Sequence, residues 1–265
     1  MRLVTYDRGG ARRLGAWVGE TVVDLPDAVG HPAFPRTMEA LVARHGGSTL
    51  DAAREVLAHP GCVEERGVPN ARLLVPFLAV PSRLPNILAP MERLPWPRRA
   101  RGLVCDLRLA CILGSAGGNL SERTAPTIVF GYTLMSRWSA LDGLRSRGRL
   151  PGARKPLAVS LGPSIATRDD ADSCEYDLVV RVDGEVWFRT DLPSARRMLL
   201  QTLAERSRRR ELGPGQIYWW APPRRHGRRA LVPPGAIVEI EAEGIGRLRH
   251  EVGTPTRARP GRADR

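Results

Sequence analysis

Two charged residues stand two positions apart in a stretch that is otherwise apolar. Asp106 and Arg108 alternate with Leu107 and Leu109, and residues two apart in a β-strand lie on the same face. A guanidinium binds a carboxylate or an enolate through two parallel hydrogen bonds. Lys155, the only lysine of the chain, adds a cation that serves as a base when burial lowers its pKa. These residue types point to chemistry on a small anion.

The sequence lacks the common patterns for zinc, triad and nucleotide chemistry. Its four cysteines are scattered, without a CxxC pair or a Cys/His cluster at zinc spacing, which fits free thiols in a reducing compartment. No G-x-S-x-G segment is present. The glycine-rich segment 115–121 lacks the lysine of a phosphate-binding loop, so we interpret it as a turn.

The chain is strongly basic, with a formal charge of +13 and a pI near 11.0. Clustered cations favour nucleic acid because they release counterions from phosphate. Here the cations are spread along the chain and are almost all arginine, which a GC-rich coding sequence also produces. No RNP aromatics, helix-turn-helix or zinc finger accompanies them. A nucleic-acid partner is therefore not favoured over a solvated surface.

The sequence indicates neither export nor membrane insertion. Its first residues lack the apolar region of a signal peptide. No apolar run approaches the roughly 20 residues that cross a bilayer. We therefore expect a cytoplasmic protein without a membrane partner.

Residues 1–80 carry the signals of a small N-terminal domain built from a β-hairpin and helices. Segments in which apolar and polar residues alternate, as in a strand, precede two segments whose apolar residues have helical spacing. Gly46-Gly47 is expected to close the first helix. The expected elements are strands over 2–7 and 73–81, a hairpin over 14–25 with Gly19-Glu20 at its tip, and helices over 37–45 and 50–59.

A proline-rich crossing segment, 81–101, separates this domain from a strand-rich domain over 102–253. Five prolines exclude regular structure from the crossing segment. Residues 254–265 cannot bury an apolar face, so we expect a disordered basic tail. In the strand-rich domain we expect strands over 103–114, 157–167, 216–222 and 236–252, a strand passing into a helix over 127–144, a hairpin over 176–191 with an Asp183-Gly184 turn, and a helix over 194–207 capped by Ser194.

Four segments in order resemble the catalytic domain of the fumarylacetoacetate hydrolase superfamily. Residues 106–114 are similar to E-x-E-L-A-x-x-I-G, and residues 130–142 are similar to F-G-Y-T-x-x-N-D-W-S-A-R-D, the most specific match. Residues 155–163 resemble K-S-F-x-x-x-x-G-P, and residues 234–249 resemble P-G-D-x-V-E-x-E-I-E-G-I-G-x-L-x-N. The N-terminal hairpin matches the family's small leading domain, so the resemblance covers about residues 2–252.

The resemblance implies an α+β, mostly β fold. A catalytic domain of twisted β-sheets follows a small N-terminal hairpin-and-helix domain, and the family is usually homodimeric. The resemblance also implies a small-molecule oxo-acid substrate and a divalent cation held by three carboxylates. Such a cation chelates a 1,3-dicarbonyl and stabilises the enolate formed during C–C bond hydrolysis, decarboxylation or isomerisation.

This sequence departs from the family at all three metal-ligand positions. Asp106 is a shorter acid, Arg108 replaces the second acid and Arg137 replaces the third. Guanidiniums cannot coordinate a cation and repel it, so we expect no metal and no other cofactor. The family's catalytic histidine segment has no counterpart, and Trp219-Trp220 opens the segment that replaces its T-G-T-P loop.

We therefore predict a metal-independent enzyme of specialised, polyketide-like metabolism that acts on an oxo-acid or β-dicarbonyl-type molecule. Arg108 and Arg137 would replace the cation and stabilise an oxyanion, and Asp106 and Lys155 would complete the catalytic set. The reaction would be a C–C lyase, decarboxylase, isomerase or cyclase step. A pericyclic cyclase that needs mainly a shaped apolar pocket is an alternative. The residues expected to bind substrate are Tyr132, Ser136, Trp219 and Trp220.

A different class is a catalytically silent family member that serves as a partner or ligand-binding protein. In that case Asp106 and Arg137 would form an ion pair that fills the former metal site, and Arg108 would face solvent. A ligand held beside Arg137 favours the enzyme, whereas a site filled by that ion pair favours the silent protein. Salt-dependent retention on DNA would instead favour a nucleic-acid binder.

Overall fold

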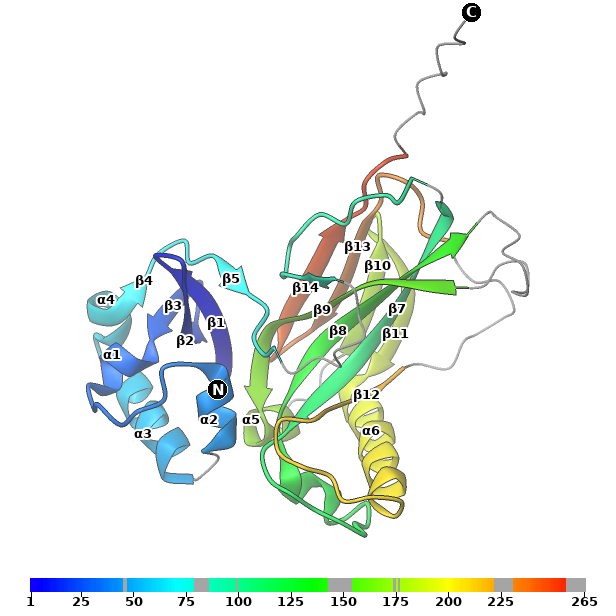
Figure 1. The fold of residues 1–265 in the computed structure, drawn as a ribbon. Helices are drawn as coiled ribbons and strands as arrows, with labels where there is room; N and C mark the ends of the chain where they lie inside the picture. The colour runs from blue at the N-terminus through cyan, green and yellow to red at the C-terminus, as the bar shows by residue number, and fades with distance from the viewer. Residues whose placement is uncertain are drawn as a thin grey trace, which may run out of the picture.

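The fold is described from a computed structural model of the chain. Residues 1–44, 47–78, 86–98, 100–142, 154–173, 175, 177–221 and 231–255 are described, with only the backbone for residue 142 and residues 154–156. The fold is mostly β, as predicted, and a large sheet and a smaller sheet contain its strands (Figure 1). The predicted disordered tail falls largely on residues 256–265, which lie outside the described residues.

The N-terminal part combines an antiparallel hairpin system with short helices. Its elements are β1 (Arg2–Arg8), β2 (Ala11–Val18), β3 (Thr21–Asp24), α1 (Leu25–Val29), α2 (Met38–Ala43), α3 (Gly47–Ala58), α4 (Cys62–Arg66), β4 (Gly67–Val68) and β5 (Leu73–Leu74). The hairpins predicted over β1 to β3 are confirmed by their antiparallel pairing. Thr37 caps α2, because its hydroxyl accepts from the Ala40 N–H at 3.3 Å. The expected role of Gly47 is wrong, since this glycine begins α3.

The large sheet contains the long strands of the C-terminal part. This region includes β6 (Ile87–Leu88), β7 (Ala100–Leu113), the 3₁₀ helix η1 (Ala125–Ile128), β8 (Val129–Asp142), β9 (Arg154–Thr167), α5 (Arg168–Asp172) and β12 (Ile217–Trp220). The main strand order is β12-β7-β8-β9-β1-β2-β3-β4. The helix expected at the end of 127–144 is wrong, because β8 pairs with β7 on one edge and β9 on the other as far as its last residues.

A second, four-stranded sheet packs with a long helix. Its elements are β10 (Asp177–Val182), β11 (Glu185–Asp191), α6 (Leu192–Ser207), β13 (Ile237–Ala242) and β14 (Gly246–Glu251). The strands are ordered β11-β10-β13-β14. The Asp183-Gly184 hairpin turn is confirmed, with positive φ at both residues.

The N-cap of helix α6 lies three residues before the expected cap. The carboxylate of Asp191, rather than Ser194, is the N-cap and accepts from the Ser194 N–H at 2.7 Å. The last residue of β11 therefore caps the helix that follows it. Within the described part of the chain, no helix is long and apolar enough to span a membrane.

The two faces of the large sheet bury different cores. One face carries Leu107, Leu109 and Trp138 and packs with residues of β10, β13, β14 and α6. The other face carries Ala110 and Ile112 and packs with apolar residues of the N-terminal part. Alternating residues of β7 therefore enter two separate environments.

The crossing segment is attached to both sheets. β6 pairs in parallel with β9, so the expectation of no regular structure between residues 81 and 101 is only partly met. The buried His250 ring shares a hydrogen bond of 2.8 Å between Nδ1 and the Glu92 carbonyl, which joins the segment to β14. Burial lowers the pKa of this histidine.

The sheet continues from the N-terminal part into the C-terminal part. β1 pairs with β2 and also with β9, where Leu3 lies opposite Ile165. Backbone hydrogen bonds therefore cross the boundary expected near residue 80. The division into a domain over 1–80, a crossing segment over 81–101 and a domain over 102–253 stays a prediction.

Candidate functional site

The β7–β8 register brings three charged residues to one face of the large sheet. Asp106 and Arg108 share a face of β7 because they lie two residues apart. Arg137 of β8 lies directly opposite Asp106. Side chains that face each other in this way have their Cβ atoms about 5 Å apart. The three positions that the family resemblance assigns to metal ligands are thus neighbours in space.

Arg108 is held on two sides. Its Nη2 lies 3.8 Å from the Asp106 carboxylate, with the two side chains only 10% and 18% exposed. The guanidinium carbon lies 5.4 Å from the centre of the Trp219 ring, which is within the range of a cation–π contact. Trp219 reaches this position because it lies opposite Ala110, on the same face of the sheet. The expected solvent-facing Arg108 is therefore wrong, since the residue is 8% exposed.

Arg137 is partly exposed beside this pair. Among the described residues, the Asp106 carboxylate forms an ion pair with Arg108, and no ion pair joins it to Arg137. The ion pair expected between Asp106 and Arg137 is thus replaced by one within β7. The face carries two guanidiniums and one carboxylate, so it favours an anion.

The residues of this face do not fit a divalent cation. Hard cations require several oxygen ligands, and the three aligned positions offer one carboxylate. Over the described residues, no group of three or more His, Cys, Asp or Glu side chains is arranged to hold a metal ion. Arg108 and Arg137 would repel a cation placed beside Asp106. Chemistry at this face would therefore depend on the side chains alone.

Lys155 lies in β9, where its backbone is opposite Ala140. Its side chain lies outside the described residues. Its expected role as a cation or base stays a prediction. The segment around His226 also lies outside the described residues.

Three of the expected substrate-binding residues lie on the opposite face. Tyr132 and Ser136 are fully buried, and the Trp138 indole N–H donates to the Ser136 hydroxyl at 3.1 Å. Burial raises the pKa of the Tyr132 hydroxyl. Trp220 lies opposite Leu109 and packs against the core between the two sheets. The structure brings only Trp219 of this set to Arg108, and the substrate-binding role of the others stays a prediction.

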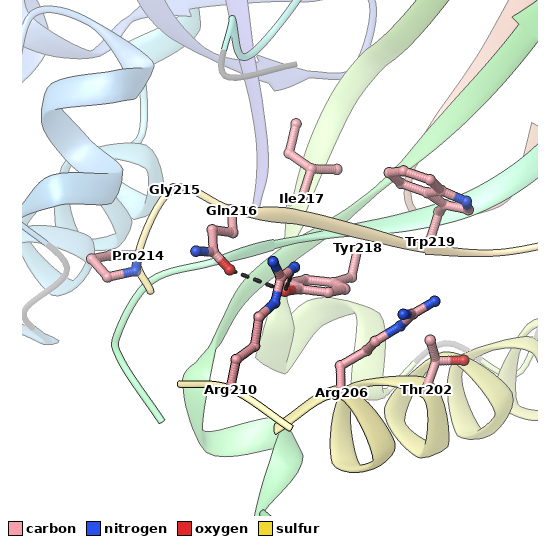
Figure 2. Close-up of a pocket in the computed structure, with 9 residues that line it drawn as sticks. All are labelled: Thr202, Arg206, Arg210, Pro214, Gly215, Gln216, Ile217, Tyr218 and Trp219. Atoms are coloured by element: carbon pink, nitrogen blue, oxygen red, sulfur yellow. Dashed lines mark hydrogen bonds between the residues drawn. The ribbon is translucent and has the colours of Figure 1, made fainter. Parts of the chain in front are cut away.

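A pocket at the β12 edge of the large sheet, on the side of α6, was not anticipated from the sequence. It lies between α6 and β12 and has a volume of about 650 Å³ (Figure 2). The residues that line it are Thr202, Arg206, Arg210, Pro214, Gly215, Gln216, Ile217, Tyr218 and Trp219. The arginine-rich run over 206–210 was visible in the sequence but was interpreted as a solvated surface. Its proximity to β12 depends on tertiary packing.

The chain belongs to the family described as fumarylacetoacetate hydrolase, C-terminal, whose profile matches residues 58–253. It is 26% identical over 157 residues to an uncharacterised protein of Methanocaldococcus jannaschii, covering 59% of this chain and 64% of that relative. It is also 26% identical over 188 residues to the human mitochondrial oxaloacetate tautomerase FAHD2B, covering 58% of this chain and 59% of that relative. The matches therefore span less than two thirds of either relative.

Solved structures support the same fold. The fumarylacetoacetate hydrolase of Exiguobacterium antarcticum superposes with a TM-score of 0.67 at 22% identity, covering 96% of this chain and 99% of that chain. Maleylpyruvate hydrolase of Sphingobium sp. SYK-6 superposes with a TM-score of 0.68 at 19% identity, covering 96% of this chain and 100% of that chain. The predicted fold class and family are thus confirmed.

Proposed function

We propose that this chain is an enzyme that stabilises an enolate or related oxyanion with two guanidiniums. The observation that carries the proposal is the excess of positive charge at one place. Among the described side chains, the guanidiniums of Arg108 and Arg137 share this part of the sheet face with one carboxylate, that of Asp106. A guanidinium binds a carboxylate or enolate bidentately. Fixed positive charge at a largely buried face stabilises negative charge that develops during a reaction.

The substrate class proposed is an oxo-acid or β-dicarbonyl-type small molecule. Relatives and structural neighbours include proteins named as a tautomerase, a hydrolase and isomerases. C–C cleavage, decarboxylation, isomerisation and some cyclisations of such molecules share an enolate. In the simplest case, tautomerisation, the proton that leaves the enol oxygen is matched by one that joins the neighbouring carbon. We assign the transfer of this proton to the Asp106 carboxylate, with Arg137 and Arg108 holding the enolate between the two events.

The finer parts of the proposal concern biology and assembly. We retain specialised, polyketide-like metabolism, a cytoplasmic location and a homodimer as proposals. The apolar residues beside the charged face, among them Trp219, would accommodate a polyketide-like body as well as a cyclase substrate. Light scattering on the purified protein gives its molecular mass in solution, which for a homodimer is twice that of the chain.

Oxaloacetate tautomerisation offers a direct test. The decay of enol absorbance is followed with protein treated with EDTA, and then with Mg²⁺ or Mn²⁺ added back. We expect activity without metal, and a loss in kcat of about a hundredfold or more in Arg137→Met, as when one oxyanion donor is removed. Arg137→Lys should retain part of the activity. Arg101→Met removes an exposed arginine from the same strand as Asp106 and should leave the rate unchanged.

A second measurement is independent of the choice of substrate. Oxalate has the charge and planar shape of a small enolate, so its binding to the EDTA-treated protein is measured by calorimetry. Binding that is present in the wild type and in Arg101→Met, and lost in Arg137→Met, supports the proposal. Binding or turnover that requires a divalent cation, or full activity in Arg137→Met, would contradict it.

A catalytically silent ligand-binding protein is the second candidate. One observation favours it: Arg108 is already engaged by Asp106 and by the Trp219 ring, as in a structural ion pair. This candidate predicts oxalate binding through Arg137 without turnover of any oxo-acid. Turnover in the wild type that is lost in Asp106→Asn, with oxalate binding retained, would decide for the enzyme.

A further inference from the structure

A second group of cations lies on α6 and the turn after it, on a different element from Arg108 and Arg137. Arg206 is in the last turn of α6 and Arg210 follows one helical turn later. Both line the pocket of about 650 Å³ between α6 and β12 (Figure 2). A volume of that size is typical of small-molecule sites.

Arg210 is oriented by a chain of hydrogen bonds. Its Nη2 donates to the Tyr218 hydroxyl at 2.9 Å, and that hydroxyl donates to the Gln216 side-chain oxygen at 3.0 Å. The backbone N–H of Arg210 also bonds to the Arg206 carbonyl. Figure 2 shows the Arg210 guanidinium directed from the α6 side toward β12. The remaining N–H groups of this guanidinium are available to a ligand.

Neither arginine is neutralised within the described part of the chain. No carboxylate there forms an ion pair with Arg206 or Arg210, whereas Arg196 on the same helix pairs with Asp172 at 3.1 Å. Among the described residues, Arg196 of α6 is thus neutralised by Asp172, whereas Arg206 and Arg210 at the pocket form no ion pair. Unneutralised guanidiniums at a concave site favour an anion.

The side of the pocket that faces α6 carries one aromatic ring, that of Tyr218. Tyr218 packs in the core shared with α6, whereas Ile217 and Trp219 belong to the core on the other face of the large sheet. Consecutive strand residues point to opposite faces, so of these three side chains only Tyr218 lies beside the arginines (Figure 2). An anion that carries a flat ring would pack against Tyr218 while its charge meets the guanidiniums.

We propose that the pocket between α6 and β12 binds a small organic anion, with a carboxylate or phosphate on Arg206 and Arg210 and an aromatic body against Tyr218. This site goes beyond the proposed function and does not rest on it, since its cations are Arg206 of α6 and Arg210 of the turn after that helix.

The competing explanation is a solvated helix end. A cation in the last turn of a helix is favoured by the helix dipole alone, and Arg206 occupies that place. That explanation treats all arginines of the 206–210 run alike. The pocket proposal does not, because Arg208 and Arg209 do not line the pocket.

The test is calorimetry with the full chain and 2-naphthoate at low ionic strength, with the neutral 2-naphthamide as the matched probe. We expect naphthoate to bind and naphthamide not to bind. The double variant Arg206→Gln/Arg210→Gln should weaken naphthoate binding about tenfold or more, as expected for charge-assisted hydrogen bonds. The double variant Arg208→Gln/Arg209→Gln loses the same charge and should bind as the wild type. Competition by acetate and by inorganic phosphate then distinguishes a carboxylate ligand from a phosphate ligand.

Two outcomes would overturn the site. Equal weakening in both double variants would mean that only the general charge of the helix end attracts the probe. Naphthoate binding that is lost in Arg137→Met and unchanged in Arg206→Gln/Arg210→Gln would place the probe at the β7–β8 face. The same Arg137→Met measurement separates the two proposals, because loss of oxalate binding with retained naphthoate binding supports both independently.

Discussion

Two clusters of aspartate and arginine among the described residues differ in their charge balance. In the N-terminal cluster, the buried Asp24 accepts hydrogen bonds from Tyr6, from Arg8 at 2.7 Å and from Arg13 at 2.8 Å. Asp27 also pairs with both arginines. Two carboxylates thus meet two guanidiniums, and the cluster joins β1, β2 and β3 to the start of α1.

The cluster on the β7–β8 face has two guanidiniums and one carboxylate. Arg108 is engaged by Asp106 and Trp219, and the neighbouring Arg137 has no ion pair among the described residues. Balanced charges satisfy each other and hold a structure together. Unbalanced charges at a face are stabilised further when an anion arrives. The same residue types therefore indicate a structural role in one place and a binding role in the other.

The largest expected effect comes from breaking the balanced cluster. Asp24→Ala leaves two guanidiniums and the Tyr6 hydroxyl without their shared acceptor, and we expect the free energy of unfolding to fall by about 3 kcal/mol. Urea denaturation at pH 7 measures the change. Oxalate binding per folded molecule should be unaffected, since the β7–β8 face is separate. A stability within about 0.5 kcal/mol of the wild type would show that the cluster is not structural.

The balanced cluster should also respond to acid. Burial raises the pKa of Asp24, but hydrogen bonds from Arg13 and Tyr6 outweigh it, so the net pKa lies below the ordinary value of 3.8. The folded state therefore binds this proton less readily than the unfolded state. The contribution of ionised Asp24 to the free energy of unfolding is complete above about pH 4. It is lost as the pH falls through the lowered pKa of this carboxyl.

Asp24→Asn isolates this contribution from other acid-sensitive groups. Urea denaturation of the wild type and the variant is compared at pH 7, 4 and 2.5. The difference in unfolding free energy should be largest at pH 7 and should narrow toward pH 2.5. A difference that is constant with pH would contradict an ionised Asp24 in the folded protein.

The smallest expected effect concerns the cluster of Asp106, Arg108 and Arg137, in which the charges do not balance. Asp106→Ala removes the carboxylate that pairs with Arg108 and raises the net positive charge of this face. We expect oxalate to bind about fivefold more tightly, equivalent to about 1 kcal/mol, while oxaloacetate turnover falls because the proposed proton carrier is absent. Calorimetry and the enol assay measure the two effects separately. Weaker oxalate binding would mean that Asp106 positions Arg108 for the ligand.

Much of the fold could be predicted from local patterns. Alternation in β7 and the Asp183-Gly184 turn each depend on a few neighbouring residues, and both are found in the structure. The end of β8 was predicted wrongly because its strand conformation depends on partners on both edges, β7 and β9. Local helical spacing there was overridden by tertiary pairing.

The candidate site was predicted in part. The sequence placed Asp106 and Arg108 on one face, and the aligned position of Arg137 indicated the third member. It did not show that Tyr132 and Ser136 would lie in the core on the other side of the sheet. That outcome depends on the register between strands, because a shift by one residue exchanges the two faces.

The amino-acid sequence alone determined the family, the mostly β fold and the exchange of two expected acids for Arg108 and Arg137, because these depend on residue identity and on order along the chain. Only the tertiary structure decided that Asp106 pairs with Arg108, and that the ring of Trp219 rather than that of Trp220 contacts the Arg108 guanidinium. It also decided that Arg206 and Arg210 meet β12 in a pocket. These contacts join segments far apart in the sequence, and the packing of whole strands and helices sets their geometry.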